Sequence, residues 1–99
     1  MKNSVGYKLG KAYGLMEKRM KECGINVDSF NLLYDMKQHT CNNMVYMFKL
    51  FHETNAWSIE ADLEIAELFL DISEIPVKLS DMEYSDFWLG IFSNYAKEK

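Results

Sequence analysis

The sequence has 99 residues, of which 48% are hydrophobic. This length allows one domain with a single core and is too short for a second domain. The formal net charge of -4 argues against nucleic-acid binding by a uniformly basic surface, because such binding needs cations to displace the counterions of the phosphates. No apolar run reaches the roughly 20 residues of a membrane span, and the N-terminus lacks the apolar core of a secretion signal, so we expect a cytoplasmic protein.

The two cysteines, Cys23 and Cys41, do not form a C-x-x-C motif and are too few for a disulfide framework. A chain with this much apolar material does not depend on a disulfide for its core. We expect both cysteines to be reduced thiols, which agrees with a cytoplasmic location.

The first predicted helix covers residues 4–23, where apolar side chains recur every three or four positions. Gly24 follows at the position where helices often end in a left-handed residue. Within the helix, Gly6, Gly10 and Gly14 are four residues apart, and each costs about 1 kcal/mol relative to alanine in a solvated helix. We expect a second helix to pack closely along the groove they leave, either from this chain or from a partner.

Two further helices are expected in the middle of the chain. The first is short and can be capped by Asp28 or Ser29. Its apolar residues are Phe30, Leu33 and Tyr34. The sequence HTCNN at 39–43 indicates a break, after which the second helix runs to about Glu53. Its apolar residues are Met44, Met47, Phe48 and Phe51.

A fourth helix is predicted over residues 58–73, SIEADLEIAELFLDIS, and Pro76 is expected to close it. One apolar stripe is expected to face the core. It consists of Ile59, Leu63, Ala66 and Leu70, with Ile65, Phe69 and Ile72 beside it. The rest of the surface is acidic and consists of Glu60, Asp62, Glu64, Glu67 and Asp71. Because the later acids oppose the helix dipole, packing must stabilise this helix.

The fifth predicted helix has the strongest amphipathic pattern. Ser80 and Glu83 have the spacing of a capping box, which starts the helix. Six large side chains then share one face, which we expect to be buried with Trp88 at its centre. They are Tyr84, Phe87, Trp88, Ile91, Phe92 and Tyr95. With no alternating strand pattern of useful length, the chain is predicted to be an all-α bundle of about five helices.

Charge is divided along the chain. Residues 1–24 carry six lysines and arginines against two glutamates, a net charge of +4, whereas residues 53–86 carry ten acids and one lysine, a net charge of -9. The candidate nucleic-acid-binding residues are Lys8, Lys11, Lys18 and Arg19 of the first helix. The alternative is that these cations form a solvated face that pairs with the acids of the fourth helix. The acidic surface itself favours a basic protein partner.

The sequence contains no recognisable catalytic or metal-binding motif. His52-Glu53 begins like a zinc-protease helix, but Ala56 occupies the position of the second histidine ligand. His39 and Cys41 lack a second correctly spaced pair of ligands. No glycine-rich phosphate loop is present, and no nucleophile and base are visibly grouped. We therefore expect a protein without metal or cofactor that is not an enzyme.

Two segments of the chain resemble a known family. NSVGYKLGKAYGLMEK at 3–18 has a Leu-Gly-basic step followed by an apolar run and Glu-Lys, and FLDISEIPVKLSDMEYSDFWLGIF at 69–92 has a proline-containing turn, a Leu-Ser helix start and a Phe-x-Leu-Gly-aromatic-aromatic core. In their order and spacing they are similar to the helical small subunit of type I-C CRISPR effector (Cascade) complexes, equivalent to the C-terminal helical domain of the type I-C large subunit. The middle helices match only in apolar pattern.

The resemblance implies a non-catalytic subunit in antiviral defence. Such a subunit packs along the effector backbone beside other subunits of the complex, and its basic first helix would support guide RNA or the displaced DNA strand. The segment Ser93 to Lys97 lacks the His, Gln and Arg residues of the family, and the chain is acidic where family members tend to be basic. The alternative is an acidic protein-interaction module, such as a phage-encoded inhibitor that mimics the subunit. Self-association is also left open.

Overall fold

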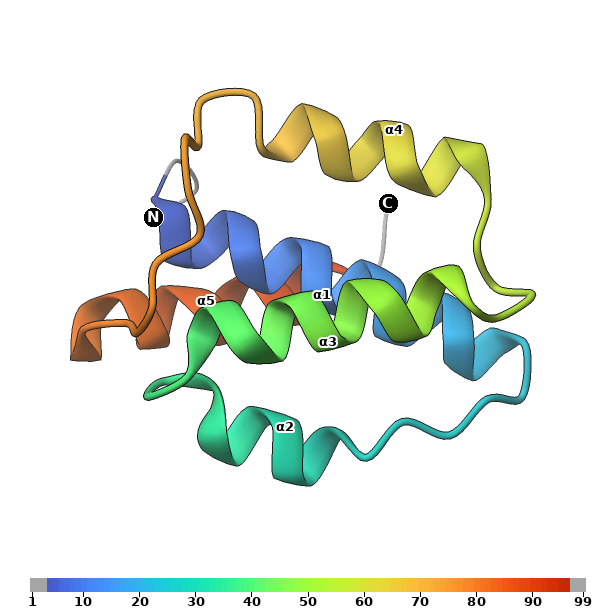
Figure 1. Ribbon diagram of the computed structural model, residues 1–99, viewed down its shortest axis with the longest axis horizontal. Helices are drawn as coiled ribbons and strands as arrows, with labels where there is room; N and C mark the ends of the chain where they lie inside the picture. The colour runs from blue at the N-terminus through green and yellow to red at the C-terminus, as the bar shows by residue number, and fades with distance from the viewer. Residues whose placement is uncertain (1–3, 97–99) are drawn as a thin grey trace.

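Five α-helices make up the fold in the computed structural model, which describes residues 4–96 (Figure 1). The helices are α1 (Val5–Glu22), α2 (Ser29–Met36), α3 (Thr40–His52), α4 (Ile59–Leu68) and α5 (Asp81–Ser93). Residues 4–96 contain no strand, and the predicted all-α bundle is confirmed. Within the same residues, no helix has the length and apolar character needed to cross a bilayer.

Helix α1 is the central element of the bundle and contacts α3, α4 and α5, while α2 packs on α3. In Figure 1, α4 and α2 lie on opposite sides of the layer that contains α1, α3 and α5. The buried core takes side chains from all five helices and two loops. It consists of Leu9, Ala12, Tyr13, Met16, Met20, Met36, Met44, Met47, Phe51, Ala56, Ala61, Ile65, Leu79, Phe87 and Ile91.

The predicted limits of α1 are confirmed. The Ser4 side chain accepts a hydrogen bond from the Tyr7 backbone N–H at 3.1 Å and caps the N-terminus. Cys23 is the C-cap, and Gly24 has a φ of 78°, a left-handed conformation that glycine adopts without strain.

The glycines of α1 form the closest helix contact in the fold, which is made with α5 of the same chain. A Cβ atom at Gly6 would overlap the carbonyl oxygen of Glu83, and one at Gly10 would overlap that of Phe87. Gly90 of α5 is the reciprocal small residue, because a Cβ there would lie 2.7 Å from the Lys11 backbone nitrogen. The expectation of close packing is thus confirmed for the intramolecular case. Gly6 lies against Glu83, and Gly10, one turn later, lies against Phe87. Helices α1 and α5 therefore run parallel.

The capping box of α5 is confirmed. The Glu83 backbone N–H donates to Ser80 Oγ at 3.1 Å, and the Ser80 N–H donates to Glu83 Oε1 at 2.9 Å. The expected buried stripe is only partly correct. Tyr84 and Trp88 are half-buried, while Phe92 and Tyr95 are exposed. Full burial is limited to Phe87, Gly90 and Ile91, because the narrow face that contains Gly90 turns toward α1.

The predicted break at 39–43 is wrong, because α3 begins at Thr40. Thr40 is buried, and its hydroxyl donates to the Met36 carbonyl oxygen at 2.6 Å. Its backbone N–H donates to the Val77 carbonyl oxygen at 2.8 Å, which supplies an acceptor that lies outside the helix. His39 is therefore the N-cap of α3, and the polar residues after it form the first turn of the helix.

Helix α2 carries its predicted apolar residues, whereas the prediction for α4 is wrong. In α2, Phe30 and Tyr34 are exposed, and Met36 is the buried residue. Helix α4 ends at Leu68, well before Pro76, and turns its predicted core stripe toward solvent. Its buried residues are Ala61 and Ile65, which lie on the other side of the helix.

Candidate interaction surfaces

Lys8, the first of the candidate basic residues, is largely buried and forms an ion pair within the chain. Its Nζ lies 2.6 Å from Asp71 Oδ1, and its side chain is only 14% exposed. The hydrogen bond and the positive charge of Lys8 lower the pKa of the Asp71 carboxyl group. Lys8 therefore connects α1 to the segment that follows α4.

Lys18 and Arg19 also bind groups of this chain. Lys18 Nζ donates to the Asn94 carbonyl oxygen at 3.0 Å, at the C-terminal end of α5. Arg19 Nε donates to the Ala56 carbonyl oxygen at 3.2 Å, and its Nη2 donates to Ser58 Oγ at 3.1 Å. Both cations satisfy polar groups at the ends of neighbouring elements, which is a structural task.

Lys11 differs from the other three candidates. Among residues 4–96, its ammonium group has no ion-pair partner, and its side chain is half-buried. The structure thus does not bring Lys8, Lys11, Lys18 and Arg19 together as a free cationic strip. Their binding to nucleic acid stays a prediction.

The outward face of α4 carries a row of exposed apolar side chains. Ile59 is 62% exposed, Leu63 is 65% exposed, and Leu70, just beyond the helix end, is 81% exposed. Ala66 is also exposed and lies between them. We call this set the α4 apolar row: Ile59, Leu63, Ala66 and Leu70.

A row of carboxylates accompanies the α4 apolar row, one residue further along the chain at each step. The α4 acidic row consists of Glu60, Glu64 and Glu67, all of which are exposed. In the part of the chain that the structure describes, no cation pairs with any of them.

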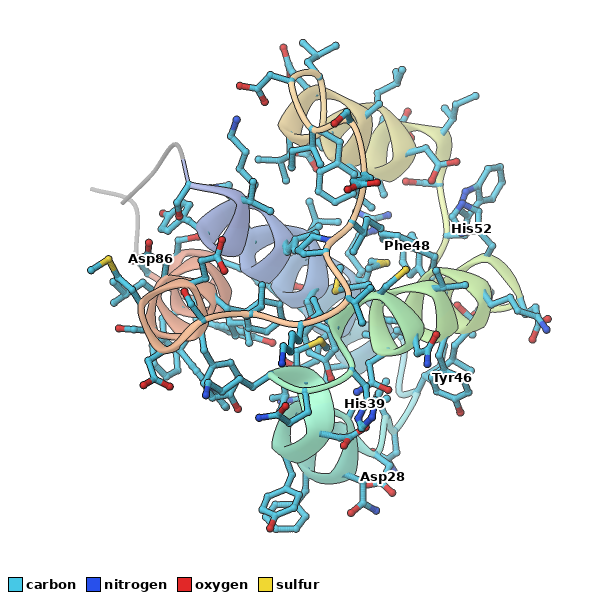
Figure 2. All side chains as sticks on the ribbon, turned by 60° about the vertical axis from the view of Figure 1, so that its left-hand side comes forward. Asp28, His39, Tyr46, Phe48, His52 and Asp86 are labelled. Carbon is cyan, nitrogen blue, oxygen red and sulfur yellow. The ribbon has the colours of Figure 1, made fainter. Side chains whose placement is uncertain are left out.

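Asp62 fixes the rotation of α4 that exposes these rows. One carboxylate oxygen accepts from the Trp57 Nε1–H at 2.9 Å, and the other lies 2.8 Å from His52 Nε2 at the end of α3, beside the start of α4 (Figure 2). Ser58 caps the helix by accepting from the Ala61 N–H at 3.1 Å. With Asp62 facing α3 and the small Ala61 facing the core, the α4 apolar row must face solvent.

A second apolar surface lies between α2 and α5. The exposed rings of Phe30 and Tyr34 are stacked with their centroids 6.3 Å apart. With Leu33, Tyr84 and Trp88, they line a shallow pocket of about 260 Å³. Sequence reasoning missed this pocket because it assigned Tyr84 and Trp88 to a buried face and could not place α2 beside α5.

Glu17 is a buried acid that the sequence pattern did not single out. Its carboxylate accepts hydrogen bonds from the Ser29 hydroxyl and, at 3.0 Å, from the Tyr95 hydroxyl. Tyr13 in turn donates to Ser29 Oγ at 3.1 Å. These bonds join α1 to α2 and to the end of α5, so the network is structural.

The other titratable residues that the structure describes include a histidine–aspartate pair and two cysteines. His39 Nδ1 lies 2.9 Å from Asp35 Oδ1, and this interaction lowers the pKa of Asp35. Cys23 and Cys41 are free thiols. Within residues 4–96, no group of three potential metal ligands comes together.

No protein-family model, curated protein or solved structure matches this chain. The candidate function rests on these surfaces and on the sequence resemblance.

Proposed function

We propose that the protein is a non-catalytic subunit that binds another protein through the α4 apolar row. The observation that carries this proposal is the exposure of Ile59 and Leu63 on one face of α4, with the exposed Leu70 just beyond the end of the helix. Covering a leucine or isoleucine side chain is worth about 1.5–3 kcal/mol, so a line of them favours association. Contiguous exposed apolar residues on a folded domain are typical of interaction sites.

We further propose that the assembly is a type I-C-like CRISPR interference complex in which the chain takes the place of the small subunit. The two segments that carry the resemblance, 3–18 and 69–92, include most of α1 and α5. The close contact of these helices along Gly6, Gly10 and Gly90 supports treating the two segments as parts of one unit. The role is antiviral defence, carried out in the cytoplasm.

Guide RNA or displaced DNA is a less well supported partner than protein. Of the four candidate residues, Lys8, Lys18 and Arg19 already bind acceptors of this chain, which leaves Lys11 to contact a phosphate. The α4 acidic row favours a second candidate function, that of a phage-encoded inhibitor that occupies the small-subunit position and keeps nucleic acid away.

Reconstitution tests the proposal. The chain is expressed with the other subunits of a type I-C effector complex whose own small subunit is omitted, and the mixture is separated by size-exclusion chromatography. We expect the wild-type chain to elute with the complex and Leu63→Gln to elute alone. Val77→Gln is the matched control, because Val77 is 74% exposed but lies outside α4.

The outcome also separates the two candidate functions. Plasmid interference that is restored by the chain supports a subunit, whereas co-elution with interference blocked supports an inhibitor. Absence of co-elution, or co-elution that is the same for wild type and Leu63→Gln, contradicts binding through the α4 apolar row.

A further inference from the structure

We infer that the α4 surface binds a basic amphipathic helix of its protein partner; this inference rests on the proposed function and names the chemistry of the partner. The evidence is the arrangement of the two rows on α4. With about 100° between successive residues, Ile59, Leu63 and Ala66 fall within an arc of about 60°. The α4 acidic row falls within a similar arc, displaced by about 100° to one side.

The apolar row accepts a helix better than a strand. Successive residues of the row are three or four positions apart, and they form a ridge of the kind that packs into the groove of another helix. The backbone N–H and C=O groups inside α4 are used within the helix, so an added strand would find no partners there. The described helix has 10 residues, which gives about three turns of contact.

The acidic row determines the charge of the partner. Glu60, Glu64 and Glu67 have no cationic partner within residues 4–96, so lysines or arginines beside the partner's apolar face would pair with them. Nucleic acid and anionic membranes are repelled by this row. A second copy of the chain is also disfavoured, because its α4 brings carboxylates and no cation to the contact.

The test uses a synthetic peptide of leucine and lysine, about 14 residues long, with leucines at i, i+3, i+4 and i+7 so that it forms a basic amphipathic helix. A control peptide has the same composition with leucine and lysine alternating. Binding to the full chain is measured by isothermal titration calorimetry at low and high salt. Amide chemical shifts of the wild-type protein give the location of the peptide without any substitution.

We expect the helical peptide to shift the amides of residues 59–70 and to bind more tightly than the alternating peptide. Leu63→Gln should weaken binding about tenfold or more, because the covered side chain becomes polar. Replacing Glu60, Glu64 and Glu67 together by glutamine should weaken binding and reduce its salt dependence. The matched control replaces the equally charged and exposed Glu22, Glu53 and Glu74, and it should bind as wild type does.

If the two triple glutamate substitutions weaken binding equally, the inference is overturned, because negative charge anywhere on the protein would then support peptide binding. Equal binding of the two peptides, or shifts outside α4, would also overturn it. Dimerisation of the chain that is abolished by Leu63→Gln would identify a second copy as the occupant. Reconstitution that depends on Leu63 but not on the glutamates would leave the proposed function intact and remove only this inference. Peptide binding at α4 without reconstitution would leave this inference intact and contradict the proposed function.

Discussion

At the scale of single residues, the neighbours Phe87 and Trp88 have very different surroundings. Phe87 is fully buried, with its ring centroid 6.0 Å from that of Tyr13, whereas Trp88 is half-buried at the edge of the α2–α5 pocket. We expect Phe87→Ala to lower the free energy of unfolding by about 3–5 kcal/mol and Trp88→Ala by clearly less. Urea denaturation of the two variants measures this difference. A larger loss for Trp88→Ala would mean that the core is centred elsewhere.

Tyr13 makes the stability of the protein sensitive to alkali. Burial raises the pKa of its hydroxyl from 10.0 to about 12. The folded state therefore holds the proton more tightly than the unfolded state, so this contribution is complete below pH 10 and is lost as the pH rises toward about 12. We expect Tyr13→Phe to reduce the loss of stability over this interval. Thermal melts at several pH values measure how stability changes with pH in the wild type and in Tyr13→Phe. The same pH dependence in both proteins would contradict the role given to Tyr13.

At the scale of secondary-structure elements, the contact between α1 and α5 depends on the absence of side chains at Gly6, Gly10, Gly14 and Gly90. Gly10→Ala should lower the free energy of unfolding by about 3 kcal/mol or more, because its Cβ would collide with the backbone of Phe87. Gly24→Ala is the control, since it meets open space and strains only a residue with a φ of 78°, at about 1 kcal/mol. Circular dichroism melts that give equal losses would exclude close packing as the reason for the glycines.

The helix ends and helix rotations differ in whether the sequence alone could predict them. The ends of α1 and the start of α5 were predictable, because Ser4, Gly24 and the Ser80–Glu83 pair act on their own helices. The start of α3 was not, because Thr40 is satisfied by a carbonyl group of a distant loop. For α4, hydrophobic periodicity could not choose between two apolar faces. Its rotation is set by tertiary contacts of Asp62 and by the small size of Ala61.

The candidate basic residues show the same limit. Sequence spacing placed Lys8, Lys18 and Arg19 on one helix, but their acceptors come from residues 56–58, 71 and 94. Whether a cation is free or engaged depends on those distant groups, which no local pattern identifies. The same holds for the α4 apolar row, whose exposure became visible only with the packing of α1 and α3.

At the scale of the whole molecule, the division of charge predicts a small contribution of α1 to nucleic-acid binding. In the reconstituted complex, replacing Lys8, Lys11 and Lys18 together by glutamine should lower the slope of log affinity against log salt by about 0.7–0.9, the value for one phosphate contact. The reason is that Lys8 and Lys18 bind acceptors of this chain, whereas the ammonium group of Lys11 has no ion-pair partner within residues 4–96. The matched control replaces the exposed Lys21, Lys49 and Lys78. A decrease equal to three contacts would show that α1 lies along the nucleic acid.

The parallel pairing of α1 and α5 has a consequence for how the protein is made. The glycine groove of Gly6 and Gly10 is filled by residues of α5, so α1 must wait for the last of the five described helices before it can bury this face. Until then, the glycine-containing face of the amphipathic helix α1 lacks its main partner, and contacts between such distant segments form slowly. We expect nascent chains stalled before residues 81–93 emerge to be cleaved readily by protease, and chains stalled after them to resist. We therefore expect complete folding of the five described helices to follow the synthesis of α5.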